Sequence, residues 1–138
     1  MLDWRDFGAA YAAEMIALSN ALATALDIAG IPIFSGTEGF TKSHQFAVCA
    51  EAFGGGQIAS KTLRNAGFLA CGIGLPIPAV NGDMNGLRIG TPELVRWGMT
   101  ATNADHLASL IARGLKNEPI MPEVSRWRKD FDRLHFIH

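Results

Sequence analysis

One segment of the sequence combines residue types that could bind a charged ligand. Arg88 stands in a short apolar run between Gly86 and Gly90, directly before Thr91 and Pro92. Because glycine carries no side chain, a ligand could approach the backbone closely here. A guanidinium held at such a place can bind a carboxylate through two parallel hydrogen bonds. By spacing alone, an ion pair at the surface is the more frequent use of such an arginine.

Two other segments carry residues that often take part in binding. Residues 54–56 are three glycines before a predicted helix, and the N–H groups at a helix start can bind phosphate. No Lys-Ser or Lys-Thr pair follows as in a phosphate-binding loop, so we predict a tight strand-to-helix turn instead. His44 is a candidate ligand residue, although a hydrogen-bonded structural histidine is more common. The four histidines and two cysteines show no metal-ligand spacing, so no metal is predicted.

The run GLRIGTP at residues 86–92, with Gly98 a few residues later, resembles the signature of serine hydroxymethyltransferases. These are pyridoxal 5′-phosphate (PLP) enzymes of fold type I. The segments SGT at 35–37, SHQ at 43–45 and GDMN at 82–85 agree with this resemblance. The amino acids at these positions are similar to those of the branch that acts on α-methylserine-type amino acids. The resemblance covers essentially the whole chain, and it covers only the C-terminal, small domain of such an enzyme.

The resemblance implies that Arg88 binds the carboxylate of an amino-acid substrate, with His44 and Arg96 as further candidate binding residues. It implies PLP as the cofactor of the complete enzyme. No catalytic or cofactor-binding residue falls in this chain, because the family's Schiff-base lysine lies in the large domain. The role of tetrahydrofolate stays open, since Arg96 and Trp97 stand where the family often has two basic residues, and residues 71–76 lack the usual folate-binding asparagine. A folate-independent aldolase and a different folate contact both fit these departures.

Residues 60–64, Ser-Lys-Thr-Leu-Arg, superficially resemble the family's sequence around the Schiff-base lysine. The context differs, because Lys61 lies in the middle of a predicted helix. No threonine-rich segment leads into it, and no glycine-rich phosphate loop follows. We therefore predict that Lys61 is a solvated helix residue.

Hydrophobic periodicity, glycine and proline predict the elements that must position Arg88. The first helix, about two dozen residues that end at Gly30, should bury one face: Phe7, Tyr11, Met15, Leu18, Leu22 and Leu26. Four later helices are predicted. One spans residues 57–65, one begins after Thr91 as its N-cap, one begins at a capping box at 102–105, and the last spans residues 123–134. Strands are predicted at 31–34, 44–49, 68–73 and 87–89. This order predicts an α+β fold, with a small antiparallel or mixed sheet of three to four strands covered by helices.

Composition limits the class of protein. The chain has 138 residues, of which 49% are hydrophobic and 18% charged, and its net charge is −1. We expect a single domain over residues 1–138 with a sizeable core, and the balanced charge argues against a nucleic-acid partner. The N-terminus has no signal pattern, the longest uncharged run is rich in glycine and proline, and the two cysteines lie in apolar runs. We therefore expect a cytoplasmic protein without a membrane partner.

Two functional hypotheses follow. In the first, the chain is the C-terminal domain of a PLP-dependent hydroxymethyltransferase or aldolase, inactive alone, whose partner is the missing large domain or a separate chain that carries it. In the second, it is a non-catalytic module derived from that enzyme, which binds a partner or itself. The apolar face that the large domain would otherwise cover favours a homo-oligomer.

Overall fold

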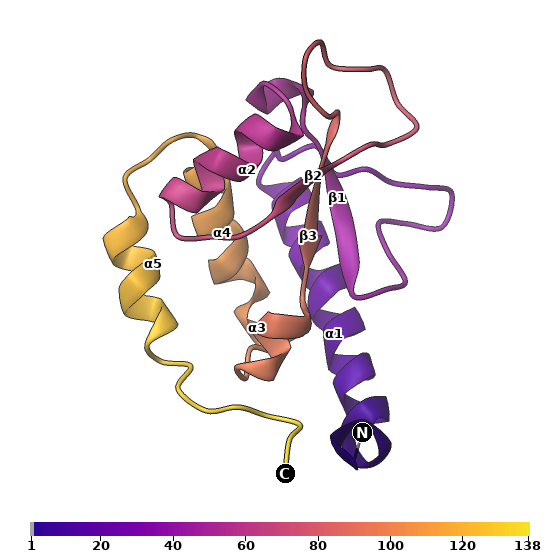
Figure 1. Cartoon of the computed structure of the whole chain (residues 1–138), viewed down its shortest axis with the longest axis vertical. Helices are drawn as coiled ribbons and strands as arrows, with labels where there is room; N and C mark the ends of the chain where they lie inside the picture. The colour runs from indigo at the N-terminus through magenta and orange to yellow at the C-terminus, as the bar shows by residue number, and fades with distance from the viewer. Residues whose placement is uncertain (1) are drawn as a thin grey trace.

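The computed structural model describes residues 2–138 and has the predicted α+β architecture, with five helices and one three-stranded sheet (Figure 1). In chain order the helices and strands are α1 (Leu2–Ile28), β1 (Gln45–Cys49), α2 (Gly56–Asn65), β2 (Cys71–Ile73), β3 (Gly86–Gly90), α3 (Pro92–Arg96), α4 (Ala104–Leu115) and α5 (Met121–Arg128). Two short 3₁₀ helices lie at Glu51–Phe53 and Ala101–Asn103.

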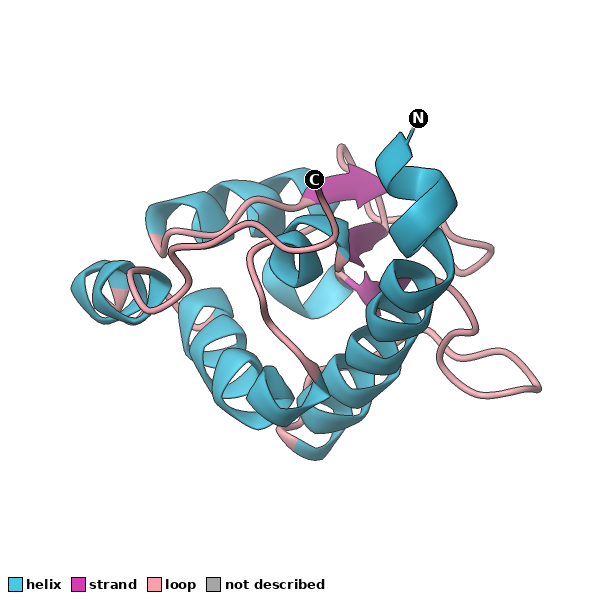
Figure 2. Ribbon diagram, turned by 90° about the horizontal axis from the view of Figure 1, so that it is seen from below, coloured by secondary structure: helices cyan, strands magenta, loops and turns pink. Residues whose placement is uncertain are grey.

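The sheet is antiparallel, and β3 is its central strand. The strand order is β1-β3-β2, so β3 pairs with Gln45–Cys49 on one side and Cys71–Ile73 on the other. The predicted strand at 31–34 is reduced to a single bridge between Ile33 and Val48. This part of the prediction is wrong because Pro32 has no N–H with which to continue a ladder. The helices gather on one side of the strands, and loops extend on the other (Figure 2).

Helix α1 contributes its inner face to the hydrophobic core. Of its predicted inner face, Tyr11, Met15, Leu18, Leu22 and Leu26 are all buried, the three leucines completely. By length and composition α1 is also the one helix among residues 2–138 that could cross a membrane, a test that core helices pass as well. Its inner face packs here against the sheet and α4 (Figure 1).

The turn after β3 is fastened to α1 and β1 by buried hydrogen bonds. The Thr91 hydroxyl lies 2.8 Å from the carbonyl oxygen of Met15 and 3.0 Å from that of His44, and the Thr91 N–H also donates to His44. The Tyr11 hydroxyl donates to the carbonyl of Pro92 over 2.8 Å. Thr91 is the N-cap residue of α3, as predicted, but its side chain makes no hydrogen bond to the N–H groups of that helix. Its fully buried hydroxyl instead satisfies carbonyls on other elements, as burial of polar groups demands.

Two predictions about helix ends are wrong. The capping box lies two residues earlier than predicted, where Thr100 and Asn103 cap the turn before α4. The last helix begins at Met121 and ends at Arg128, and residues 129–138 run back toward the start of α1. In this tail Phe136 stacks on Tyr11, with ring centroids 5.2 Å apart. Aromatic contacts with a distant helix therefore replace the predicted helical continuation.

The three glycines at the start of α2 form the tight turn that the sequence predicts. Gly54 and Gly55 have positive φ angles of 84° and 118°. Gly56 packs against the central strand, since a Cβ there would lie 2.1 Å from the carbonyl oxygen of Gly86. Only glycine lets α2 approach β3 this closely.

We predict that Gly56→Ala destabilises the domain by about 2 kcal/mol, the usual cost of overpacking a close contact. Thermal or urea unfolding of the variant measures this change. Gly74→Ala is the matched control, because a Cβ at Gly74 meets nothing within 4 Å and its φ is not positive. The control should stay within about 0.5 kcal/mol of the parent chain. Equal stability of the two variants would show that α2 does not depend on this contact.

Candidate functional site

The register of the sheet places Arg88 on the outer face of β3. Leu87 and Ile89 point inward and are buried, so Arg88 between them points away from the core and is exposed. Its cross-strand neighbours are Ala47 on β1 and Cys71 on β2. Since directly paired residues point to the same face, a long cationic side chain stands here between two small ones.

Glycines at the alternate positions of β3 complete this outer face. Gly86 and Gly90 lie two residues before and after Arg88 and therefore share its face. Gly86 is covered by the loop 74–85, because a Cβ there would lie 2.6 Å from Cγ of Leu75. The Asn85 amide holds this loop, accepting from the Leu75 N–H over 2.7 Å and donating to the carbonyls of Leu75 and Ile77. Asn85 is a positioning residue that the sequence analysis missed.

Among residues 2–138 no side chain or backbone atom makes a hydrogen bond or ion pair with the Arg88 guanidinium. The ion pairs of this part of the chain join other residues: Arg5–Asp6, Lys42–Glu38, Arg113 with Glu118 and Glu123, and His138–Asp6. The surface ion pair that spacing alone favours for Arg88 is therefore not formed within the described chain. No atom of the described residues engages its five N–H donors, so a ligand could accept from them.

Arg88 lines a cavity of about 940 Å³ between the sheet, α3, α4 and α5. His44, at the entry to β1, lines the same cavity, so the structure brings these two predicted residues together. Arg96 is not part of this lining. Its guanidinium lies over the ring of Tyr11, 4.9 Å from the ring centre, where it packs against α1.

Three further lining residues were not found from the sequence. Cys71 reaches the cavity because it pairs with Arg88, a register that only the structure gives. Trp127 and Arg128 come from α5. No sequence motif marked any of the three as a residue that contacts a ligand. The Arg128 guanidinium is already engaged, since it stacks 4.5 Å from the ring centre of Trp97 and donates to the carbonyl of Phe131.

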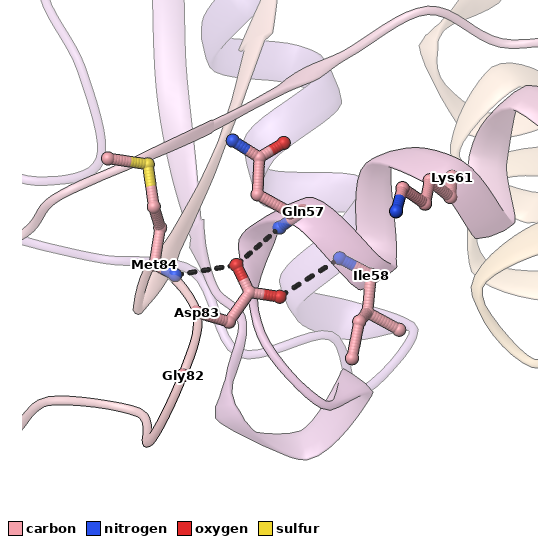
Figure 3. Close-up of a pocket in the computed structure, with 6 residues that line it drawn as sticks. All are labelled: Gln57, Ile58, Lys61, Gly82, Asp83 and Met84. Carbon is pink, nitrogen blue, oxygen red and sulfur yellow. Dashed lines mark hydrogen bonds between the residues drawn. The ribbon is translucent and has the colours of Figure 1, made fainter.

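A carboxylate of the chain itself occupies the N-terminus of α2. Asp83 accepts from the N–H groups of Gln57 at 2.9 Å, Ile58 at 3.1 Å and Met84 at 2.5 Å (Figure 3). The hydrogen bond from Gln57 is the largest cause that lowers the pKa of Asp83, followed by those from Ile58 and Met84 and the charge of Lys61. A phosphate bound at this helix start would have to displace that carboxylate.

The described residues do not fit PLP. The cofactor needs a lysine amine and a phosphate cradle close together. Lys61 is exposed on α2, and the glycine-rich helix start beside it is filled by Asp83. Nor do residues 2–138 hold any group of three or more His, Cys, Asp or Glu side chains arranged for a metal ion.

We predict that Asp83→Asn destabilises the domain near neutral pH and that this difference shrinks on acidification. The folded-state pKa of Asp83 lies below its ordinary value of 3.8, so ionised Asp83 stabilises the fold above that value. The contribution is lost as the pH falls through the lowered folded-state pKa. Thermal unfolding from neutral pH to about pH 3 measures the difference.

Asp132→Asn is the control for this experiment, because exposed Asp132 makes no side-chain hydrogen bond with residues 2–138. It should change the melting temperature little at any pH. A pH-independent loss for Asp83→Asn would contradict the role of its charge at the start of α2.

Searches for related proteins found no matching family model. The chain is 52% identical over 141 residues to an alpha-methylserine aldolase of Ralstonia sp, covering 99% of this chain and 32% of that enzyme. It is 32% identical over 139 residues to a serine hydroxymethyltransferase of Pyrobaculum aerophilum, again covering 99% of this chain and 32% of the enzyme. The chain thus spans about a third of the length of the curated relatives that it matches.

A solved structure agrees with these similarities. The crystal structure of L-threonine transaldolase from Pseudomonas fluorescens in its internal aldimine state superposes with a TM-score of 0.76 and 25% identity. The match covers 97% of this chain and 31% of the transaldolase, which is an enzyme of PLP fold type I. Sequence and fold together show that this chain is homologous to the C-terminal part of the alpha-methylserine aldolases and serine hydroxymethyltransferases.

Proposed function

We propose that this chain is the substrate-clamping part of a PLP-dependent enzyme that acts on α-methylserine-type amino acids, and that Arg88 binds the substrate carboxylate. The observation that carries the proposal is the Arg88 guanidinium, unpaired among residues 2–138, on a sheet face of small residues. PLP belongs in this proposal to the remaining two-thirds of the enzyme, on the same polypeptide or on a partner chain. The described residues themselves do not fit the cofactor, so this chain contributes binding and orientation.

The geometry suits a carboxylate for a physical reason. A guanidinium presents parallel N–H donors in a plane, and a carboxylate can accept two of them together. Gly90, two residues after Arg88 on the same face, carries no side chain that could stand in the way. An amino acid bound by its carboxylate would have one end fixed, which limits the rotation of the groups on its α-carbon.

His44 and Arg96 have different places in this proposal. We assign His44 as a second polar contact, because this residue lines the same cavity as Arg88. Arg96 instead rests on Tyr11 and accepts a backbone hydrogen bond from His135 through its carbonyl oxygen. This placement supports a packing role for Arg96 at the junction of α1, α3 and the C-terminal tail.

The comparisons favour the aldolase over the hydroxymethyltransferase as the activity of the complete enzyme. The alpha-methylserine aldolase is 52% identical to this chain and the hydroxymethyltransferase 32%. We therefore propose that the reaction does not require tetrahydrofolate. The missing asparagine in residues 71–76 supports this assignment.

Exposed apolar side chains support contacts with the rest of the enzyme. Leu69, at the mouth of the cavity, is 87% exposed, and Ile28, at the end of α1, is 81% exposed. Leu2 and Trp4 are also exposed at the start of α1. We propose that such residues are covered by the large domain or by a second protomer in a homo-oligomer.

We predict that Arg88→Met in the complete enzyme raises KM for the amino-acid substrate by about 10- to 100-fold, the cost of removing a charged partner from a bound carboxylate. Arg88→Lys should recover part of this loss, because it restores the charge but not the paired donors. Steady-state kinetics of the variants measures the effect.

Arg126→Met is the matched control, since Arg126 is exposed on α5 and does not line the cavity. It should leave KM unchanged. Unaltered substrate affinity in both methionine variants would show that the carboxylate binds elsewhere.

A further inference from the structure

We propose that the outer face of the sheet carries a substrate subsite above Gly90, between Arg88 and Gln45, in which the Gln45 amide donates to the substrate carboxylate. The inference rests on the proposed function for the role of Arg88 and adds two residues to that site. Gln45 is a second hydrogen-bond donor, and Gly90 is a position left open for the ligand. The ligand is the carboxylate end of a small α-methyl amino acid.

The register of β1 against β3 brings Gln45 to the face that carries Arg88. Gln45 pairs directly with Gly90, and Ala47 pairs with Arg88. Side chains alternate along a strand, so Gln45 and Ala47 share the outer face, whereas Phe46 between them is buried in the core. Gln45 is therefore the diagonal neighbour of Arg88, a position from which two long side chains can reach each other.

The hydrogen bonds around Gln45 and Gly90 show that the two residues form a close cross-strand pair. The Thr91 N–H donates over 2.9 Å to the carbonyl of His44, one residue outside the pair. In an antiparallel ladder, bonds that flank a pair mark the non-hydrogen-bonded kind, in which the two Cα atoms approach most closely. The Gln45 side chain therefore begins directly beside the bare backbone of Gly90.

The fold itself does not require a glycine at position 90. The φ angle of Gly90 is not positive, and a Cβ there would lie 3.6 Å from Cδ of Pro92 and 3.9 Å from the carbonyl oxygen of His44. Both are ordinary van der Waals distances. Gly86 differs, because a Cβ on it would lie 2.6 Å from Cγ of Leu75. Since Gly90 is also exposed, the space above its backbone is open to a ligand.

The backbone of Gln45 is fixed, whereas its side-chain amide makes no hydrogen bond with residues 2–138. The Gln45 carbonyl oxygen accepts from the hydroxyls of Thr41 at 2.6 Å and Ser43 at 3.2 Å. The Gln45 N–H donates to the Ser43 hydroxyl over 3.3 Å. The exposed side chain keeps both N–H donors of its amide for a ligand. A fixed backbone that carries such a donor suits a ligand contact, which requires a well-positioned group.

A carboxylate can use both side chains at once. Its two oxygens offer about four acceptor positions, of which a guanidinium that binds side by side takes only part. The Gln45 N–H can therefore donate to a position that Arg88 leaves free. Two donors from different directions limit the rotation of the carboxylate, and they thereby fix where the groups on the α-carbon lie.

The test measures the dissociation constant of α-methylalanine for the complete enzyme by isothermal titration calorimetry. This amino acid has the carboxylate and the α-methyl group but no hydroxyl, so a contact with a substrate hydroxyl would not affect it. Gln45→Leu keeps the size of the side chain but removes its donors, and it should weaken binding about tenfold. Gln57→Leu is the matched control and should leave affinity unchanged, because Gln57 is exposed on α2, outside the cavity that Arg88 and Gln45 line. Unchanged affinity in Gln45→Leu, or an equal loss in both variants, would overturn the proposal.

Gly90→Ala tests the open space separately from the hydrogen bond. The variant should melt no lower than the parent enzyme, because its Cβ has room and alanine restricts the unfolded chain more than glycine does. It should nevertheless bind α-methylalanine about tenfold more weakly, because the methyl group occupies the space of the ligand. Gly74→Ala is the control and should change neither property. Full affinity in Gly90→Ala would overturn the proposal, as would a lower melting temperature, which would assign the glycine to folding.

Arg88→Met, measured beside these variants, separates this proposal from the proposed function. Because both side chains would hold the same carboxylate, the loss of affinity in the double variant should be smaller than the product of the losses from Arg88→Met and Gln45→Leu. Losses that multiply fully would overturn the shared contact. A loss with Arg88→Met but none with Gln45→Leu would overturn the subsite and keep the proposed function. No loss with Arg88→Met would contradict the proposed function itself.

Discussion

The central strand can bury only every second side chain, and the rest of the site depends on this constraint. Leu87 and Ile89 fill the core beneath the sheet, so Arg88 between them must point to the other face. A shift of one residue would bury the guanidinium and expose both apolar side chains. The hydrophobic core thus fixes the direction in which the chain presents the Arg88 guanidinium.

Contacts at both ends hold β3 in this register. At its start, Gly56 of α2 touches the carbonyl of Gly86, and the Asp83 carboxylate joins the preceding loop to the same helix. At its end, Thr91 joins the strand to α1 and β1 through buried hydrogen bonds. The side chains that matter for ligand binding therefore stand on a strand whose ends are fixed by non-local contacts, as precise positioning requires.

Much of the fold could be predicted from the sequence, because its strongest signals are local. The repeat of Tyr11, Met15 and Leu18 defines the inner face of α1, and the glycines around Arg88 mark the central strand. The errors arose where distant residues decide the structure. The tail after Arg128 is held by α1 through Phe136, and the Thr91 hydroxyl bonds to carbonyls of other elements instead of to N–H groups of α3. The motif identified Arg88, but only the register and tertiary packing reveal its neighbour Cys71 and the cavity wall around Trp127.

In the proposed function the Arg88 guanidinium binds the carboxylate of the substrate. The most direct measurement is a crystal structure of the complete enzyme with an α-methyl amino acid bound. We expect two parallel N–H···O contacts between Arg88 and the carboxylate, each about 2.8 Å long. A carboxylate bound by other residues, with the Arg88 guanidinium directed into solvent, would contradict this account.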